Sequence, residues 1–338
     1  MARAQRMESP EEFGLVIGVD LGGTSIDAAL VDVSARVCHV VHLPTPREPE
    51  RVVPAVLAVI GDLLARPEAL AMPVKGIGIA SAGLVDEAGM VISAANLRWR
   101  RIPLRERVLA TFGLATVLEN DTNAAAVAEQ LYGAGAGAQH LIYIGLGTGV
   151  GAGFILGGAL YRGNGSAGEI GHMQMLRDGP VCACGRRGCL EALVGGRAIG
   201  ERAERLAQQY PDSGLAGLYR QMGRLSARDV VSVAGQDAVA AGLIEEVAIY
   251  VGVAVGNLVQ VFDPDLIILG GGVAGSGRVF LDRVEQEARL IASATSGRPL
   301  RLALSSLGAD AGVVGAAALI IQHLSVVSGS PATKNASG

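Results

Sequence analysis

Three cysteines and a histidine have a spacing that suits a metal ion. Cys182 and Cys184 are separated by one residue, Cys189 follows a glycine-containing bend, and His172 lies ten residues before Cys182. Three thiolates and one imidazole complete a tetrahedral shell, the closed geometry typical of structural zinc. The alternative is three buried thiols beside an unrelated histidine, but the intervening glycines form tight turns and add nothing to a core. The spacing therefore predicts a structural zinc site.

A glycine-rich turn near the N-terminus has the composition of a phosphate-binding site. A short apolar run ends at Asp20, and Gly22, Gly23 and Thr24 precede a second apolar run, which predicts strand, tight turn and strand. The backbone N–H groups of the two glycines can converge on phosphate oxygens, Thr24 adds a hydroxyl, and Asp20 can hold Mg²⁺ through water. An ordinary β-turn would be the better reading if the pattern stood alone.

The pattern recurs more than a hundred residues later, where Gly147, Thr148 and Gly149 lie between two apolar runs within 143–156. Two such turns predict two similar domains that hold one polyphosphate from opposite sides. This is the organisation of the actin-like ATPase (ribonuclease H-like) fold, an α/β fold with a nucleotide cleft between two domains.

A third glycine run follows the buried strand expected over 266–269 and includes Gly271 and Gly272. Without side chains the backbone can approach a ligand closely, which suits the ribose and adenine end of a nucleotide. A plain loop explains this run equally well.

Polar residues follow the short strand expected over 115–118. Asp121, Thr122 and Asn123 precede an alanine-rich helix, and one of them is expected to be its N-cap. One cap is sufficient, and ligands of open α/β sheets bind at the carboxyl ends of strands, which favours a functional role for Asp121. Asn96 lies in another polar break, where a plain turn residue is the better reading.

Composition excludes several classes of protein. Half of the 338 residues are hydrophobic, the net charge is −4, aromatic residues make up 4%, and there are 48 glycines. This balance is typical of an α/β enzyme with many tight turns, and no basic field indicates nucleic acid. Outside the predicted zinc set only Cys38 remains, so no disulfide framework is expected and a reducing cytoplasm fits best.

Neither a signal peptide nor a membrane span is expected. The first 13 residues have no apolar core. Segment 141–161 is apolar and has about the length of a span, but seven glycines interrupt it, so it is predicted to form two strands joined by a glycine turn. By periodicity, helices are expected over 49–64, 197–210, 243–262, 279–291 and 311–321, a strand over 74–80, and disorder over 325–338.

Together these residues resemble the ROK family of sugar kinases and related repressors, and most closely its zinc-containing, ATP-dependent glucokinase branch. The most specific part is EIGH at 169–172 followed by CACGRRGCLE at 182–191. The runs DLGGT, NDTNAA, GLGTGVG and LGGG follow in the family's order. The likeness extends from about Leu15 to Ile321.

The resemblance implies a role for each matching residue. Asp121 stands where these kinases have the base that takes the proton from the 6-hydroxyl of a hexose. The other implied sugar ligands are Asn96 and Asn120 at the ring hydroxyls, Glu169, His172 and Glu191 at the C1–C2 side, and Gly83 in the adjoining loop. The implied nucleotide ligands are Asp20, Gly22, Gly23 and Thr24 in the first phosphate loop, Gly147, Thr148 and Gly149 in the second, and Gly271 and Gly272 beside adenosine.

This sequence departs from the family pattern at two positions of the site. Ala82 stands where a proline often precedes Gly83, which is expected to loosen that loop, and Ser25 stands where a lysine is common. ROK repressors also carry a DNA-binding helix-turn-helix at the N-terminus, for which the dozen or so residues before the first strand leave no room. A repressor is therefore not expected.

The resemblance thus implies an ATP:hexose 6-phosphotransferase, with glucose first, that uses ATP and Mg²⁺ and has a structural zinc ordering its sugar site. Kinases for N-acetylmannosamine, N-acetylglucosamine, fructose or allose would use the same residues. A non-catalytic sugar-sensing regulator and an ATPase of the actin or chaperone type are the alternatives from other classes. A homo-oligomer, dimer or tetramer, is expected, with lobes over 13–120 plus 309–326 and over 121–308, and flexible tails at 1–12 and 327–338.

Overall fold

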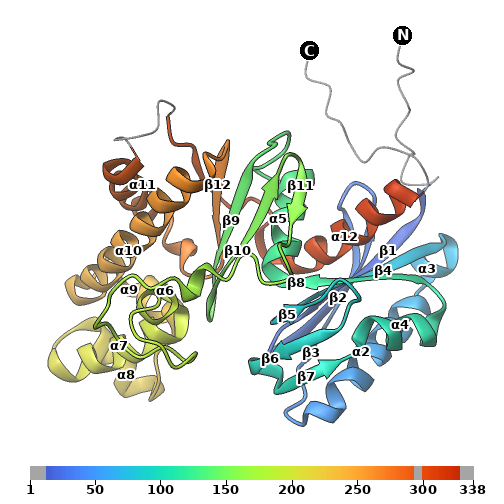
Figure 1. Cartoon of the computed structure of the whole chain (residues 1–338). Coiled ribbons are helices and arrows are strands. Elements are labelled where there is room, and N and C mark those ends of the chain that lie inside the picture. Colours follow the sequence, from blue (N-terminus) through green and yellow to red (C-terminus); the bar gives the residue numbers. More distant parts are fainter. Residues whose placement is uncertain (1–12, 293–298, 328–338) are drawn as a thin grey trace. The chain divides into compact units, whose positions relative to one another are not determined.

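The computed structural model describes residues 13–292 and 299–327, which fall into two compact units (Figure 1). The tails expected at 1–12 and 327–338 lie outside the described residues except for Val327, which is the last residue of a helix. The boundaries of these units differ from those of the expected lobes. The first lobe was expected to end at residue 120, but the helix that begins at Asp121 packs within the same unit as the residues before it. Unit 1 comprises Met1–Gly137, Leu160–Ala167 and Ser306–Gly338, and unit 2 comprises Ala138–Ala159 and Gly168–Ser305.

Unit 1 contains a five-stranded sheet with the order β3 (Val37–Pro44), β2 (Ser25–Asp32), β1 (Leu15–Leu21), β4 (Val74–Ser81) and β8 (Ala115–Asn120). The first three strands pair antiparallel, whereas β4 and β8 run parallel to β1. Leu21 is aligned with Ser81, and Ser81 with Asn120. The segments that leave β1, β4 and β8 therefore start at one edge of the sheet.

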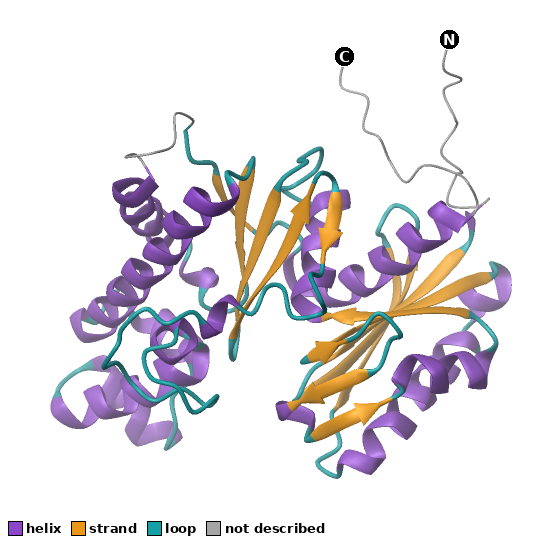
Figure 2. Ribbon diagram, viewed as in Figure 1, coloured by secondary structure: helices purple, strands orange, loops and turns teal. Residues whose placement is uncertain are grey.

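Helices cover both faces of this sheet (Figure 2). Val16 packs against α12 (Ala311–Val327), whereas Leu15 and Ile17 pack in the cluster that contains α2 (Pro49–Leu64), because successive strand residues point to opposite faces. The other elements of unit 1 are α3 (Pro67–Ala71), α4 (Leu104–Phe112), α5 (Asp121–Tyr132) and a small sheet of β5 (Leu84–Val85), β6 (Val91–Ala94) and β7 (Trp99–Ile102).

Helix α12 lies directly on the sheet because two strand residues lack side chains. A Cβ atom on Gly18 would lie 2.1 Å from the carbonyl oxygen of Val313, and one on Gly78 would lie 1.8 Å from that of Ala316. No larger residue fits at either position without moving the helix. The helix expected over 311–321 therefore packs tightly on β1 and β4.

Unit 2 repeats the same sheet topology. Its strands have the order β11 (Ala159–Tyr161), β10 (Val150–Leu156), β9 (Leu141–Leu146), β12 (Leu266–Gly270) and β13 (Leu302–Leu304). As in unit 1, a glycine turn joins two antiparallel strands, here β9 and β10. Strands β12 and β13 run parallel to β9. The expectation of two similar domains is confirmed. The helices of unit 2 are α6 (Leu190–Val194), α7 (Gly196–Gln209), α8 (Gly214–Met222), α9 (Ala227–Val233), α10 (Ala238–Phe262) and α11 (Arg278–Ala292).

The long helix α10 is apolar enough to cross a membrane by length and composition. Half of its most apolar window is nevertheless buried inside the protein, and Val247, Val251 and Val255 belong to the core of unit 2. Its apolar character is explained by this burial.

The expectation of disorder from residue 325 was wrong at its start, because α12 continues to Val327 and Ser325 donates a hydrogen bond to the carbonyl of Ile321 at 2.9 Å.

One buried carboxylate holds both ends of the long segment inserted into unit 1. The chain leaves unit 1 after Gly137 and, apart from the short stretch Leu160–Ala167, returns to it at Ser306. Glu129 of α5 is 0% exposed and accepts hydrogen bonds from the backbone N–H groups of Ser306 at 3.0 Å and Ala134 at 2.8 Å. The Ser306 hydroxyl donates a further bond at 3.4 Å. Glu129 therefore fixes the chain just before it leaves unit 1 and where it returns.

Replacing Glu129 with alanine is expected to lower the melting temperature by roughly 5–10 °C, because two backbone N–H groups would lose a charged, buried acceptor. Differential scanning calorimetry measures this. The control is Glu201→Ala, which removes an exposed partner of Arg197 and should change the melting temperature by no more than about 1 °C. Equal effects of the two variants would contradict the role of Glu129.

Candidate active site

The turn predicted to bind phosphate in unit 1 is held from outside by a threonine. The backbone N–H of Gly22 donates to the Ser25 carbonyl at 2.9 Å, which closes the turn. The hydroxyl of Thr45 donates to the Gly22 carbonyl at 2.8 Å, and its backbone N–H donates to the Thr24 carbonyl at 3.0 Å. Thr24 is exposed. The part played by Thr45, which starts a loop after an edge strand, was not found from the sequence.

Asn96 lies against this turn. It occupies a short 3₁₀ turn (Ala95–Leu97) and is exposed. A Cβ atom on Gly23 would lie 2.6 Å from the Cβ of Asn96, so the absence of a side chain at Gly23 permits the approach. Asn96 is a turn residue, as its local sequence indicated, and also a neighbour of the predicted phosphate site.

Asp20 precedes the turn in a strongly acidic setting. The pKa of its carboxyl is raised to about 7. Burial is the largest cause, and the charges of Asp121 and Asp27 add to it. Carboxylates whose repulsion disfavours ionisation gain from a bound cation. The donor set around Asp20 therefore fits a hard divalent ion such as Mg²⁺.

Asn120 is the N-cap of α5, so the expectation of a cap at Asp121, Thr122 or Asn123 was wrong. Its Oδ1 accepts hydrogen bonds from the backbone N–H groups of Thr122 at 2.9 Å and Asn123 at 3.1 Å. Its Nδ2 donates to the Gly83 carbonyl at 3.1 Å, and an amide nitrogen has a second hydrogen to offer a ligand. The cap was missed because the strand ends two residues later than expected, at Asn120 itself.

Asp121 is thereby the first residue of the helix and is exposed. Its Oδ1 accepts bonds from the backbone N–H of Thr122 at 2.8 Å and from the hydroxyl of the same residue at 3.2 Å. Desolvation by the surrounding protein raises the pKa of Asp121, although hydrogen bonds from Thr122 and Asn120 lower it. A carboxylate with a raised pKa and an accessible oxygen can act as a general base.

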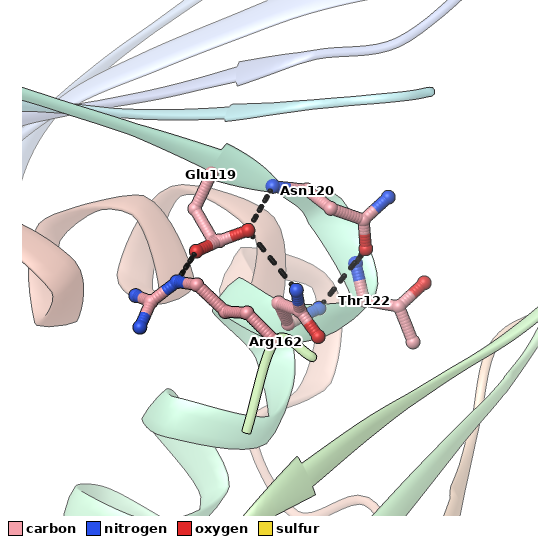
Figure 3. Close-up of polar contacts among 5 residues, drawn as sticks. Glu119, Asn120, Thr122 and Arg162 are labelled. Carbon is pink, nitrogen blue, oxygen red and sulfur yellow. Dashed lines mark hydrogen bonds and ion pairs between the residues drawn. The ribbon is translucent and has the colours of Figure 1, made fainter. Parts of the chain in front are cut away.

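Glu119 ties this turn to another part of the chain (Figure 3). The residue is 5% exposed. Its Oε1 accepts bonds from the Asn120 N–H at 2.9 Å and from Asn123 Nδ2 at 3.0 Å, and its Oε2 accepts one from Arg162 Nε at 2.5 Å. Sequence reasoning did not single out Glu119 or Arg162. The available signal was a carboxylate at the end of a buried strand, directly before the polar run.

In unit 2 the second glycine turn is fixed by the start of α7. Gly147 and Thr148 are exposed, and their carbonyls accept bonds from the backbone N–H groups of Gly196 at 2.8 Å and Arg197 at 3.3 Å. These contacts hold the turn in place without using the Thr148 side chain.

Glu191 reaches the same turn. Its Oε2 accepts a bond from the Val150 N–H at 3.1 Å, and a Cβ atom on Gly149 would lie 2.4 Å from that oxygen. Gly149 is therefore needed for this contact. The geometry brings a predicted sugar ligand and a predicted phosphate turn together within unit 2.

Backbone packing explains Gly271 of the third glycine run. Gly271 has φ +88°, and a Cβ atom there would lie 2.4 Å from the Leu146 carbonyl oxygen. Gly272 is half-buried, and a Cβ atom on it would lie 3.6 Å from Arg228 Nε. The role of these glycines beside adenosine stays a prediction.

His172, Cys182, Cys184 and Cys189 form one cluster, as their spacing predicted. Their ligand atoms all lie within 4.8 Å of one another. Cys182 Sγ is 3.8 Å from His172 Nδ1, and Cys184 Sγ is 3.7 Å from Cys189 Sγ. Ligands at the bond lengths of tetrahedral zinc stand about 3.6–3.8 Å apart, so the cluster fits a zinc ion. Nδ1 then faces the metal, and His172 Nε2 lies 3.8 Å from Glu169 Oε2.

The thiols of this cluster differ in acidity. Hydrogen bonds from the Arg186 backbone and side chain lower the pKa of Cys184 to about 6, which makes it largely a thiolate at neutral pH. Burial raises the pKa of Cys189 to about 11 and also raises that of Cys182. A cation among them favours the deprotonated forms, because metal ions bind thiolates.

Each unit thus gathers its own share of the predicted site residues. Unit 1 holds the predicted base with the first predicted phosphate turn, and unit 2 holds the Cys₃His cluster with the second predicted phosphate turn. The members are Asp20, Gly22, Gly23, Thr24, Gly83, Asn96, Asn120 and Asp121 in unit 1, and Gly147, Thr148, Gly149, Glu169, His172, Cys182, Cys184, Cys189, Glu191, Gly271 and Gly272 in unit 2.

Replacing Asp20 with asparagine is expected to raise the melting temperature of the ligand-free protein more at pH 8 than at pH 5. The pKa of Asp20 is raised from 3.8 to about 7 in the folded protein. The folded protein therefore keeps this proton at pH values at which the unfolded chain has already released it. The carboxyl therefore costs stability progressively as the pH rises through that window, and asparagine removes the cost.

Differential scanning fluorimetry from pH 5 to pH 8 without divalent cations measures this. Asp282→Asn, at an exposed partner of Arg278, is the control and should show no such trend. Added Mg²⁺ should narrow the gap between wild type and the Asp20 variant. A gain that is the same at both pH values would contradict the raised pKa.

Comparison with known proteins places the chain among kinases and repressors. The glucokinase of Streptomyces coelicolor is 37% identical over 316 residues, which are 91% of this chain and 98% of the relative. The xylose repressor of Bacillus subtilis is 27% identical over 317 residues, covering 93% of this chain and 78% of the repressor.

A solved structure has the same fold. The ROK family glucokinase from Streptomyces griseus, crystallised in complex with glucose and AMPPNP, has a TM-score of 0.80 and 37% identity, covering 90% of this chain and 99% of that one. Residues 16–323 match the ROK family as a whole. The chain therefore belongs to the ROK family and has its two-domain, actin-like ATPase fold.

Proposed function

We propose that the protein is an ATP:hexose 6-phosphotransferase whose first substrate is glucose. The observation that carries the proposal is the position of Asp121 in unit 1. It begins α5 at the sheet edge from which the first phosphate turn also leaves, and its charge acts on Asp20. The glucokinase relatives support hexose and ATP as substrates.

The proposed reaction uses Asp121 as the base. The hexose 6-oxygen attacks the γ-phosphorus, the hydroxyl proton passes to the Asp121 carboxylate, and the bond from the γ-phosphorus to the bridging oxygen breaks to release ADP. A fixed carboxylate also orients the attacking lone pair. The raised pKa of Asp121 brings the base nearer to working pH, where proton transfer is most effective.

The two metal ions would have different tasks. Asp20 would hold Mg²⁺, which neutralises phosphate charge during transfer. Zinc at the Cys₃His cluster would have four protein ligands and no open position, so it would stabilise the loop rather than react. With His172 Nδ1 on the metal, Nε2 and the neighbouring Glu169 would bind the sugar hydroxyls at C1 and C2. Asn96, Asn120 and Glu191 would bind other hydroxyls.

The proposed compartment and partners of the protein follow from its thiols and its net charge. Three zinc-binding thiols require a reducing compartment, so we place the reaction in the cytoplasm. The net charge of −4 gives no electrostatic attraction to nucleic acid. We expect a dimer or tetramer.

The second candidate function is a sugar-sensing regulator, which the relationship to a xylose repressor favours. A regulator would bind sugar without hexose-dependent release of ADP.

Asp121→Ala is expected to lower kcat by roughly 10²- to 10⁴-fold, because it removes the proton acceptor, while nucleotide binding persists. A coupled assay of ADP release with glucose and other hexoses measures turnover, and titration calorimetry with an ATP analogue measures binding. Asp282→Ala is the matched control. Wild-type turnover by the Asp121 variant would refute the assignment, and a wild type that binds hexose but releases no ADP would indicate the regulator.

Cys184→Ser is expected to remove bound zinc and to raise the hexose KM at least about tenfold, because the loop that carries Glu169 and His172 depends on the metal for its folding. Elemental analysis gives the zinc content. Cys38→Ser is the control, since this thiol lies outside the cluster. Unchanged zinc in the Cys184 variant would rule out the site.

A further inference from the structure

Glu119 is a buried carboxylate in the proposed catalytic turn that the proposed reaction does not use. Its two oxygens make three hydrogen bonds, to the Asn120 N–H, to Asn123 Nδ2 and to Arg162 Nε. Asn120 and Asn123 lie on either side of Asp121 in sequence. Glu119 therefore holds the turn before and after the proposed base.

The bond to Asn123 is the contact that holds that side chain. Asn123 is 7% exposed, and its Oδ1 is buried without a hydrogen-bond partner in the described part of the chain. Its Nδ2 bond to Glu119, at 3.0 Å, thus orients the amide. Loss of the Glu119 carboxylate would release the first turn of α5 as well as the end of β8.

Arg162 supplies the charge that this buried carboxylate requires. A buried carboxylate is strongly disfavoured unless it is paired, and Arg162 Nε lies 2.5 Å from Glu119 Oε2, with the arginine side chain 42% and the glutamate side chain 7% exposed. Figure 3 shows the arginine reaching the carboxylate from the side opposite Asn120. The ion pair therefore holds the Glu119 carboxylate in place.

Arg162 comes from the segment that leads into the predicted sugar and zinc ligands. It belongs to Leu160–Ala167, the stretch in which the chain rejoins unit 1 between two parts of unit 2. Its own carbonyl accepts bonds from the N–H groups of Gly165 at 2.9 Å and Ala167 at 3.2 Å, which shape the turn before Glu169. One residue thus organises this turn and pairs with the turn that carries Asp121.

We propose that Glu119 and Arg162 form a positioning pair for Asp121, an inference that rests on the proposed function. The pair sets the direction of the Asp121 carboxylate without touching substrate. A base displaced by about 1 Å can cost roughly a hundredfold in rate, so the pair acts on kcat. It contacts no residue of the first phosphate turn among the described contacts, so the KM for ATP is not affected.

Glu119→Gln and Arg162→Met should each lower kcat at saturating hexose by about 10- to 100-fold, with the ATP KM unchanged within about twofold. The double variant should be about as slow as either single variant, because residues that act as one unit are not additive. Arg162→Lys keeps the charge and should recover part of kcat. Arg289→Met is the matched control, since Arg289 forms an exposed pair with Glu285, and it should keep wild-type kcat.

Circular dichroism melts identify an assay temperature at which every variant is folded. Wild-type kcat in the Glu119 and Arg162 variants, beside an inactive Asp121→Ala, would overturn the positioning pair and leave the proposed function standing. A rise in ATP KM that accompanies the loss of kcat, or a double variant whose loss is the product of the single losses, would also overturn it. Full activity of Asp121→Ala would instead refute the assignment of Asp121 as the base, and with it the positioning role of Glu119 and Arg162.

Discussion

The parallel pairing of β1, β4 and β8 is the constraint on which the site in unit 1 depends. Its register aligns Leu21, Ser81 and Asn120, so that the predicted phosphate turn, a loop and a helix start from one edge of the sheet. A slip by one residue would turn every side chain to the opposite face. The glycines beneath α12 secure the register, since the helix backbone lies directly on β1 and β4 and a shifted strand would place a larger side chain there.

Much of this arrangement could be predicted because its signals are local. Helix α2 has the expected bounds, and both glycine turns join antiparallel strands as the repeated pattern indicated. The Cys₃His cluster was also predictable, since all its ligands lie within one short stretch and glycines allow the chain to bend between them. Local composition carries this information because turns and metal loops are made by neighbouring residues.

Contacts between distant residues could not be read in this way. Arg162 is 43 positions from Glu119, and no periodicity indicates which cation will meet a buried carboxylate. The N-cap at Asn120 was missed for a related reason: a strand and a helix compete for the same residue, and the parallel register decides between them. The bounds of the compact units likewise depend on where α5 packs, which its own sequence does not specify.

The stretch that carries the Cys₃His cluster follows β11, the outermost strand of its sheet. The equivalent strand of unit 1, β3, is followed by a short connection into α2. Extra chain added after an edge strand interrupts no hydrogen-bonded ladder, and longer connections cost little additional closure entropy. In this architecture the connection after an edge strand can therefore lengthen while every strand pairing of the sheet is kept.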